Sequence, residues 1–246
     1  MKKPAVWIFI TVFMHVILPG TIYAQNTDTN LVSNQLKIAG QYYSSKIADQ
    51  SRLLNGIKYL PYRNQDYTGN GYYNTTELQK AYIRYDDVDY YDIPVLYDLH
   101  KDLLILRRRD DQGYMSLLNT KLDKFIINGH TFIKIIADST DKKIKTGFYD
   151  VLHEGSLQLL AKRTKAIEQE KSGITIRNLF VPYTKYFLHK ENTFYDISGQ
   201  KDMLKVLKDK KQELEQYIKA NNLSFKNEDM EPSMIKLTNY YNQLTR

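Results

Sequence analysis

The spacing of apolar residues changes along this chain of 246 residues. Residues 6–18 form one largely apolar run. Between residues 78 and 196, short runs rich in Ile, Val, Leu and Tyr alternate with turn residues, which is typical of antiparallel strands. After Asp196 the apolar positions recur at i, i+3 and i+4, as on an amphipathic helix. We therefore predict a β domain followed by a helical tail.

Asn128-Gly129 is the strongest turn signal in the β region. Asn-Gly is a favoured two-residue hairpin loop, because both loop positions must adopt positive φ. A loop of that kind fixes the register of its two strands, and here it places Phe125 opposite Phe132. An aromatic pair at directly opposed positions stabilises a sheet.

A second hairpin is predicted at Glu154-Gly155, which would place Leu152 opposite Leu157. Together the turn signals delimit about ten strands, more than a single small sheet usually holds. We therefore expect the antiparallel strands to form a curved sheet, a half-barrel or a sandwich.

Two helices are predicted in the tail. Ser198 is a suitable N-cap for the first, which Asn221-Asn222 would end, and Asp229 could cap the second. Their apolar stripes are Met203, Leu204, Val206, Leu207, Leu214, Tyr217 and Ile218, followed by Met234, Leu237, Tyr241 and Leu244. Because isolated helices of this length are marginal in water, both are expected to pack on the β domain and to bury Leu207 and Leu214.

The apolar positions of residues 36–54 fit a helix better than a strand, and Asn55-Gly56 would end it. The predicted fold class is therefore α+β. It consists of a mainly antiparallel sheet with an N-terminal helix and a C-terminal helical pair.

The first 24 residues have the order of a secretory signal peptide. Lys2 and Lys3 precede the apolar run, Pro19-Gly20 breaks it, and Ala24 offers a small residue at the cleavage site. The run is too short to span a bilayer. We expect export to the periplasm or the cell exterior. The predicted organisation is a signal peptide (1–24), a flexible leader (25–33), a helix plus antiparallel β domain (34–197) and a docked two-helix tail (198–246).

Composition excludes several classes of protein. The chain has no cysteine, which excludes disulfide scaffolds, thiolate metal sites, thiol nucleophiles and lipoprotein anchors. Its 35 basic and 28 acidic residues give a net charge of +7, and loss of Lys2 and Lys3 with the signal peptide leaves +5. The basic residues are scattered among acids, so nucleic acid is not an expected partner. No later run is long enough for a membrane-spanning helix, so none is expected in the mature chain.

No pattern identifies catalytic, cofactor-binding or metal-binding residues, and no cofactor is expected. The four histidines after residue 24 lack the spacing that places two ligands on one helix face, and the densest carboxylate cluster lacks the calcium-loop pattern. These residues are His100, His130, His153 and His189, and Asp86, Asp87, Asp89 and Asp92. Catalytic carboxylates can come from distant strands, so a hydrolase stays open.

Tyrosine is unusually abundant, with 21 residues in the chain. Several lie in a loop that runs from Tyr59 to Asn74 and contains Pro61, Gly69, Asn70 and Gly71. Tyrosines in strands often fill half-buried positions, whereas exposed tyrosines suit sugar or protein recognition. Tyr62, Tyr67, Tyr72 and Tyr73 are the predicted recognition surface.

Several segments are similar to exported, tyrosine-rich β-meander proteins of Bacteroidota. They are Leu54-Asn55-Gly56 with Tyr59, Val95-Leu96-Tyr97-Asp98 with Asp102 and Leu104, Phe125 to Phe132, Tyr149-Asp150-Val151-Leu152 with Gly155, Leu160-Ala161-Lys162, Tyr217-Ile218, Leu223, Phe225 and Tyr240-Tyr241. The resemblance covers most of the mature chain and implies a β-meander with a short helical tail. No function is assigned to that set, so the resemblance implies none here.

Three functions are compatible with these patterns. The first is a non-catalytic envelope binding or interaction protein, whose partner would be an envelope protein, a glycan or an apolar ligand. The second is a periplasmic carrier that holds an apolar ligand under a curved sheet. The third is a secreted hydrolase that uses two carboxylates. A filled core with an exposed tyrosine patch would favour the first, and a deep apolar cavity the second.

Overall fold

A computed structural model describes residues 33–40, 42, 52–63, 66–108, 113–138, 144–172 and 175–245. The predicted signal peptide and residues 25–32 of the leader lie outside the described residues. The chain divides into two units, residues 1–36 and 37–246, and every strand and every C-terminal helix described below belongs to the second.

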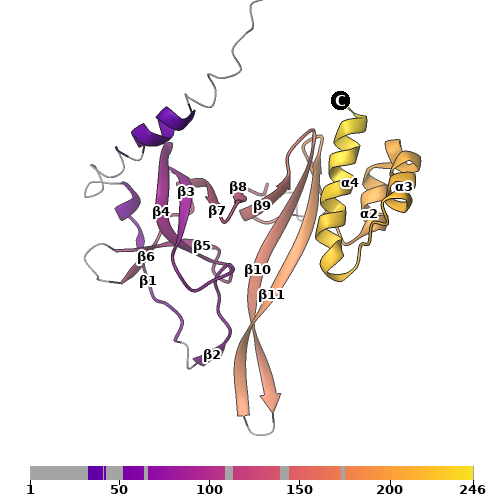
Figure 1. Cartoon of the computed structure of the whole chain (residues 1–246). Coiled ribbons are helices and arrows are strands. Elements are labelled where there is room, and N and C mark those ends of the chain that lie inside the picture. The colour runs from indigo at the N-terminus through magenta and orange to yellow at the C-terminus, as the bar shows by residue number, and fades with distance from the viewer. Residues whose placement is uncertain are drawn as a thin grey trace, which may run out of the picture. The chain divides into compact units, whose positions relative to one another are not determined.

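Within the described residues, one sheet of twelve strands dominates the fold (Figure 1). The strands are β1 (Ile57–Tyr59), β2 (Tyr67–Thr68), β3 (Gln79–Tyr85), β4 (Val88–Asp98), β5 (Leu103–Arg107), β6 (Tyr114–Ser116), β7 (Leu122–Ile127), β8 (His130–Ile135), β9 (Gly147–His153), β10 (Leu157–Ser172), β11 (Thr175–Lys190) and β12 (Thr193–Ile197). Their order is β1-β6-β5-β4-β3-β7-β8-β9-β10-β11-β12, and β2 pairs in parallel with β11. The mainly antiparallel fold is confirmed, and the sheet is larger than the predicted sheet of about ten strands.

The sheet curls strongly. β1 stands at one end of the strand order, yet β2 follows it in sequence and pairs with β11 close to the other end. Residues 60–66 join these strands, and seven residues span at most about 25 Å. The β4–β5 turn also reaches β10, where His100 Nδ1 lies 2.9 Å from the Lys165 carbonyl oxygen. The two ends of the sheet are therefore brought within reach of each other.

The Asn128-Gly129 hairpin is confirmed in its register. Both residues have positive φ, 51° and 78°, and Phe125 pairs with Phe132. The two rings stack with centroids 4.9 Å apart and an interplanar angle of 12°. The turn residues alone determine this register, because a two-residue loop leaves no freedom in strand alignment.

The register of the second hairpin, between β9 and β10, differs from the predicted one. β9 ends at His153, which pairs with Leu159, and a bulge follows in the ladder. The prediction that Leu152 lies opposite Leu157 is therefore wrong, because the loop at Glu154-Gly155 includes additional residues.

Helix α4 (Met230–Leu244) explains that longer loop. The Asn242 amide oxygen accepts hydrogen bonds from the Leu157 N–H and the Ser156 hydroxyl, both at 2.9 Å. Its amide nitrogen donates to the Leu157 carbonyl, also at 2.9 Å. A Cβ on Gly155 would overlap the same amide, so the loop depends on a residue more than 80 positions away.

A main core of aliphatic and aromatic residues packs against strands β3–β9. Tyr97 packs at its centre, with ring centroids 4.9 Å from Phe125 and 5.1 Å from Phe132. The largest fully buried members are Ile83, Tyr85, Tyr97, Leu104, Leu117, Leu122, Phe125, Ile127, Phe132 and Phe148. This packing holds β3–β9 in a fixed curvature.

The tail packs beside the β10–β11 hairpin and forms a second, helix-covered core (Figure 1). It comprises α2 (Gln200–Val206), a 3-10 turn η3 (Lys208–Lys210), α3 (Lys211–Ala220), η4 (Asn227–Asp229) and α4. Leu207 and Leu214 are fully buried there, in one cluster with Leu157 and Leu188 of the strands. The first predicted helix is broken at Leu207, which has φ −99° and ψ 37°.

The predicted N-terminal helix is short. Residues 33–40 and 42 are helical, residues 43–51 lie outside the described residues, and Arg52–Leu54 forms a 3-10 turn, η1. Leu53 in this turn is buried in the main core, which anchors the start of the β domain. No helix in the described ranges is long and apolar enough to cross a membrane.

Candidate binding surface around Tyr59

A buried carboxylate organises the tyrosine-rich loop. Asp98 ends β4 and is completely buried. One carboxylate oxygen accepts the backbone N–H groups of His100 and Lys101 at 2.9 Å, which shapes the β4–β5 turn. The other oxygen accepts the hydroxyls of Tyr59 and Tyr62, both at 2.8 Å. Four donors satisfy this carboxylate, as a buried charge requires.

The same contacts fix the tyrosines in their neutral form. Burial raises the pKa of Tyr59 and of Tyr62, and the Asp98 charge raises both further. The Tyr59 hydroxyl also lies 3.3 Å from that of Tyr72, whose pKa is raised by burial as well. Because the Tyr59 and Tyr62 hydroxyls donate to Asp98 inside the protein, their rings are held in place before any ligand binds.

An aromatic cluster forms where the loop meets β11. The Tyr62 ring centroid lies 4.8 Å from Phe180 and 5.6 Å from Tyr67, and Tyr67 lies 5.1 Å from Phe180. Pairing of β2 with β11 positions Tyr67 beside this cluster. Edge-to-face packing of aromatic rings adds rigidity beyond simple burial. No local sequence pattern indicated that Phe180 joins this cluster, because the parallel pairing brings together residues more than 100 positions apart.

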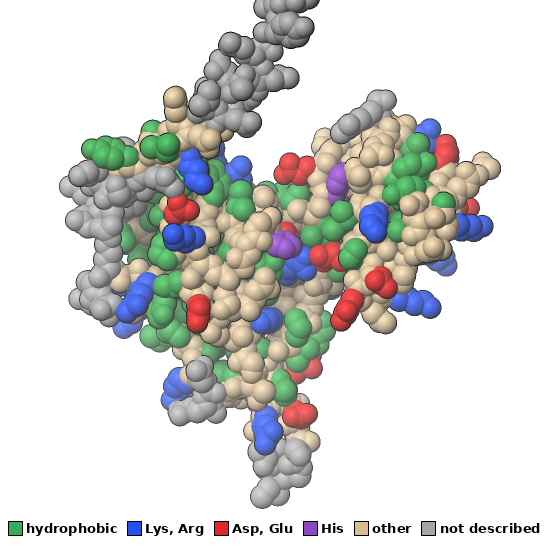
Figure 2. All heavy atoms as spheres, in the orientation of Figure 1, with side chains coloured by type: hydrophobic (Ala, Val, Ile, Leu, Met, Phe, Trp, Pro, Cys, Tyr) green, Lys and Arg blue, Asp and Glu red, His purple; other side chains and the backbone are tan. Residues whose placement is uncertain are grey.

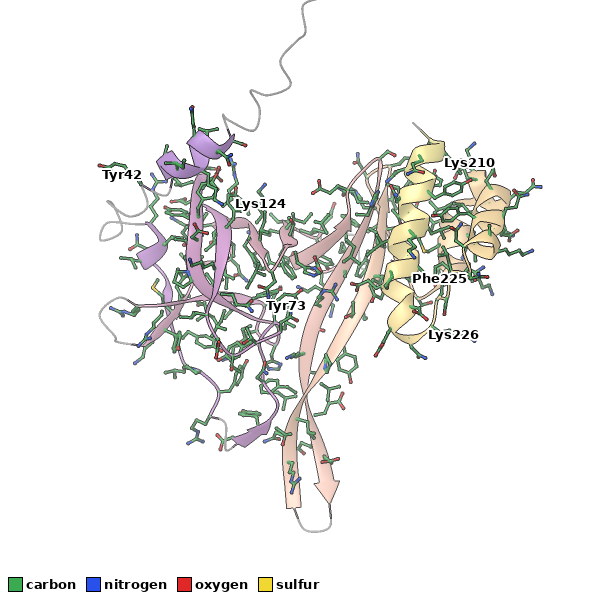
Figure 3. The ribbon with its side chains drawn as sticks, in the orientation of Figure 1. Tyr42, Tyr73, Lys124, Lys210, Phe225 and Lys226 are labelled. Atoms are coloured by element: carbon green, nitrogen blue, oxygen red, sulfur yellow. The ribbon has the colours of Figure 1, made fainter. Side chains whose placement is uncertain are left out.

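The four predicted tyrosines do not form one exposed patch. Tyr62 and Tyr67 are partly exposed, whereas Tyr72 and Tyr73 are only 8% and 6% exposed. Tyr73 points into the main core (Figure 3), where its ring centroid lies 5.2 Å from Phe132. The rings of Tyr62, Tyr67 and Tyr72 lie close to one another, whereas Tyr73 is part of the main core.

Two hollows adjoin each other at Tyr59, which lines both. An aromatic pocket of about 280 Å³ is lined by Tyr59, Pro61, Tyr62, Tyr72, Thr76, Leu96 and Tyr114. An apolar groove of about 500 Å³ is lined by Ile57, Lys58, Tyr59, Leu60, Lys101, Leu103, Ser116, Leu117, Leu118, Asn119 and Thr120. Ile57 and Leu60, which both line the groove, are 62% and 68% exposed. We call the pocket and the groove together the Tyr59 surface.

Comparison of the chain with protein-family models, curated proteins and solved structures found no match.

Two lysines support the Tyr59 surface. The Lys101 ammonium lies 4.6 Å from the Tyr59 ring centroid and 4.4 Å from that of Tyr62, within the range of cation–π attraction. Lys165 of β10 donates to the carbonyl oxygens of Asn70 at 2.9 Å and Tyr72 at 2.7 Å. Burial lowers the pKa of Lys165. Lys165 therefore ties the tyrosine loop to the far end of the curled sheet.

A second charged network ties α4 to the sheet. The Asp150 carboxylate is fully buried and accepts Arg163 Nε at 2.7 Å, and His130 Nδ1 lies 2.9 Å from the same oxygen. Arg163 also donates to Glu231 of α4 at 2.8 Å, and Tyr186 donates to Glu231 at 3.0 Å. Burial alone would lower the pKa of Arg163, but these two carboxylates raise it. The network docks α4 on the sheet through Glu231, and the second Asp150 oxygen, Oδ1, is buried without a hydrogen-bond partner among the described residues.

The acidic cluster and the histidines make ordinary structural contacts. Among the described residues, no group of three or more His, Asp or Glu side chains is placed to hold a metal ion. Asp86, the first residue of the acidic cluster, lies near Arg52 and Lys121, whose nitrogens are 3.2 Å and 3.3 Å from its carboxylate. His189 stacks on Phe194 with ring centroids 4.3 Å apart. The acidic cluster and this histidine thus contribute to local packing and ion pairing.

Proposed function

We propose that the chain is exported and acts as a non-catalytic interaction protein that binds an extended polypeptide segment of an envelope partner at the Tyr59 surface. The observation that carries the proposal is the position of Tyr59. It ends the edge strand β1 and lines an aromatic pocket on one side and an apolar groove on the other. An extended segment projects alternate side chains in opposite directions, so it could fill both hollows.

The size and rigidity of the surface suit such a segment. A hollow of 280 Å³ lies just below the range of pockets for complete small ligands, so it fits a single side chain. The hydrogen bonds of Tyr59 and Tyr62 to Asp98 hold the rings in advance, which reduces the entropy lost on binding. The exposed Ile57 and Leu60 favour an apolar partner over a glycan, because sugars would leave their side chains without apolar cover.

The carrier hypothesis has less support. The side chains of the main core pack against one another, with the ring centroids of Tyr97 and Phe125 4.9 Å apart, so they occupy space beside the sheet that an apolar ligand would need. The two fully buried carboxylates do not favour the hydrolase hypothesis, because Asp98 accepts four hydrogen bonds and Asp150 is ion-paired with Arg163.

Site-specific photo-crosslinking in cells that make the protein tests the proposal. A photo-reactive amino acid at Leu60 should form an adduct with one defined envelope protein. The matched control is Ile136, another aliphatic residue, which is 74% exposed but lines neither hollow. The purified partner should then lose affinity for Leu60→Asp and keep it for Ile136→Asp. Equal adducts at both positions, or a partner insensitive to Leu60→Asp, would refute the proposal.

Export is tested separately by the mass of the mature protein. Cleavage after Ala24 removes Trp7, the only tryptophan, so the mature chain should lack indole fluorescence. Full-length mass and indole emission in the purified cellular protein would contradict export with cleavage.

A further inference from the structure

The C-terminal helices carry a groove that the proposed function does not use. It runs along α2, η3 and α3 and has a volume of about 820 Å³. Its lining residues are Gln200, Lys201, Asp202, Leu204, Lys205, Lys208, Lys211 and Glu215. All four lysines are exposed. Blue side chains are prominent over this part of the molecule in Figure 2.

The sequence spacing of these lysines places them along one groove. Lys201 and Lys205 are one turn apart on α2, so they share a face. The chain then leaves α-helical geometry at Leu207, and Lys208 and Lys211 continue the lining from η3 and the start of α3. Lys201, Lys205 and Lys208 are spaced i, i+4 and i+7, so they lie along one face, and Lys211 extends the lining at the start of α3.

The charges of the groove are unbalanced. Four ammonium groups face two carboxylates, which leaves a net charge of +2 within the groove. Asp202 accepts hydrogen bonds from the Ser198 hydroxyl and backbone N–H, which lower its pKa and keep it ionised. Glu215 pairs with Lys211 at 3.7 Å. Within the described part of the chain, Lys201, Lys205 and Lys208 have no carboxylate at ion-pair distance, so they can receive an anionic ligand.

We infer that this groove binds an anionic saccharide chain, one that bears carboxylate or phosphate groups on successive units. Lys201 and Lys205 are separated by about 6 Å along the helix axis, a spacing compatible with charges on neighbouring sugars. None of the lining residues is aromatic, so the groove offers no platform for nucleobase stacking. Leu204 is its one apolar lining residue and is 7% exposed, so nothing projects to insert into a bilayer.

The test uses the full mature chain and a size-defined oligogalacturonate, with the fully methyl-esterified oligomer as the neutral probe. Lys201, Lys205 and Lys208 are replaced together by Gln. The control replaces Lys219, Lys226 and Lys236 by Gln, three exposed lysines of the same tail that do not line the groove. Figure 3 labels Lys226 at the opposite end of the helical layer from Lys210, which lies in η3. Both variants lose the same charge, and Lys and Gln have similar helix propensities.

The groove variant should bind the anionic oligomer about tenfold more weakly at low salt, and the control variant should bind it like the parent chain. Added salt should weaken the parent chain more than the groove variant. Equal losses in both variants, or equal binding of the esterified oligomer, would overturn the inference. Lysine-dependent binding to phosphatidylglycerol vesicles without binding to the oligomer would also overturn it. Leu60→Asp should leave oligomer binding intact, which separates this groove from the Tyr59 surface.

Discussion

Replacing Asn242 by Ala tests how the helical tail controls the β sheet. Asn242 is 5% exposed and makes three hydrogen bonds of 2.9 Å to the loop between β9 and β10. Alanine removes all three and leaves the N–H and carbonyl of the fully buried Leu157 without these partners. The variant should therefore lose stability even though alanine is the better helix former.

The magnitude follows from the groups that lose their partners. A buried polar group without a hydrogen bond costs about 1–3 kcal/mol, and two backbone groups of Leu157 are affected. Residues 154–156 of the loop are exposed, so water can reach part of the site and reduce this cost. We expect the free energy of unfolding to fall by about 2–4 kcal/mol. With a urea dependence on the order of 2–3 kcal/mol per molar, the midpoint should fall by about 1 M.

Urea denaturation followed by far-UV circular dichroism measures this loss. Asn239→Ala is the matched control, because Asn239 lies on the same helix and is exposed. Both variants gain the same helix propensity, so their difference isolates the contacts of Asn242. If the two differ by less than about 0.5 kcal/mol, Asn242 does not hold the loop and the reasoning fails.

Three further substitutions test the packing, the turn and the titration. Leu207→Asp buries an unpaired charge and should lower the free energy of unfolding by several kcal/mol. Ile136→Asp is the exposed control and should be nearly neutral. An unchanged thermal melt for Leu207→Asp would contradict docking of the tail. Gly129→Val should lower the free energy of unfolding by about 1–3 kcal/mol through the positive φ alone, because no atom lies within 4 Å of the added Cβ. Gly129→Asn should lose much less stability, because Asn tolerates positive φ. Burial lowers the pKa of His189 from 6.5, so His189 of the unfolded chain is protonated first as the pH falls. The free energy of unfolding should therefore decrease as the pH is lowered from about 7.5 to about 5.5. His189→Gln should flatten this pH dependence, and equal slopes in the parent and the variant would refute the prediction.

Local sequence was sufficient where a few neighbouring residues determine the geometry. Asn128-Gly129 gave the hairpin and its register, because positive φ at both positions and a two-residue loop leave one alignment. The alternation of apolar runs and turns likewise predicted the antiparallel fold, and the 3.6-residue spacing predicted the tail helices. Each of these features depends on interactions within a few residues along the chain.

The candidate sites required the tertiary structure. The sequence indicated a tyrosine-rich loop, but Asp98 decided which rings are held at the Tyr59 surface, and Tyr73 went to the core instead. Phe180 joined through the parallel pairing of β2 with β11. No local pattern could separate these tyrosines, because all lie in one short segment and differ only in what folds against them.

Two departures from the predicted elements have the same cause. The loop at Gly155 follows the amide of Asn242, and the first tail helix breaks at Leu207, which is fully buried under the helices. The local geometry at both positions is determined by contacts with residues distant in sequence. The sequence by itself determined the kinds of elements and the register of one hairpin, since those follow from backbone torsions and side-chain periodicity. The curl of the sheet and the choice of tyrosines were decided by long-range packing, which local propensities do not encode.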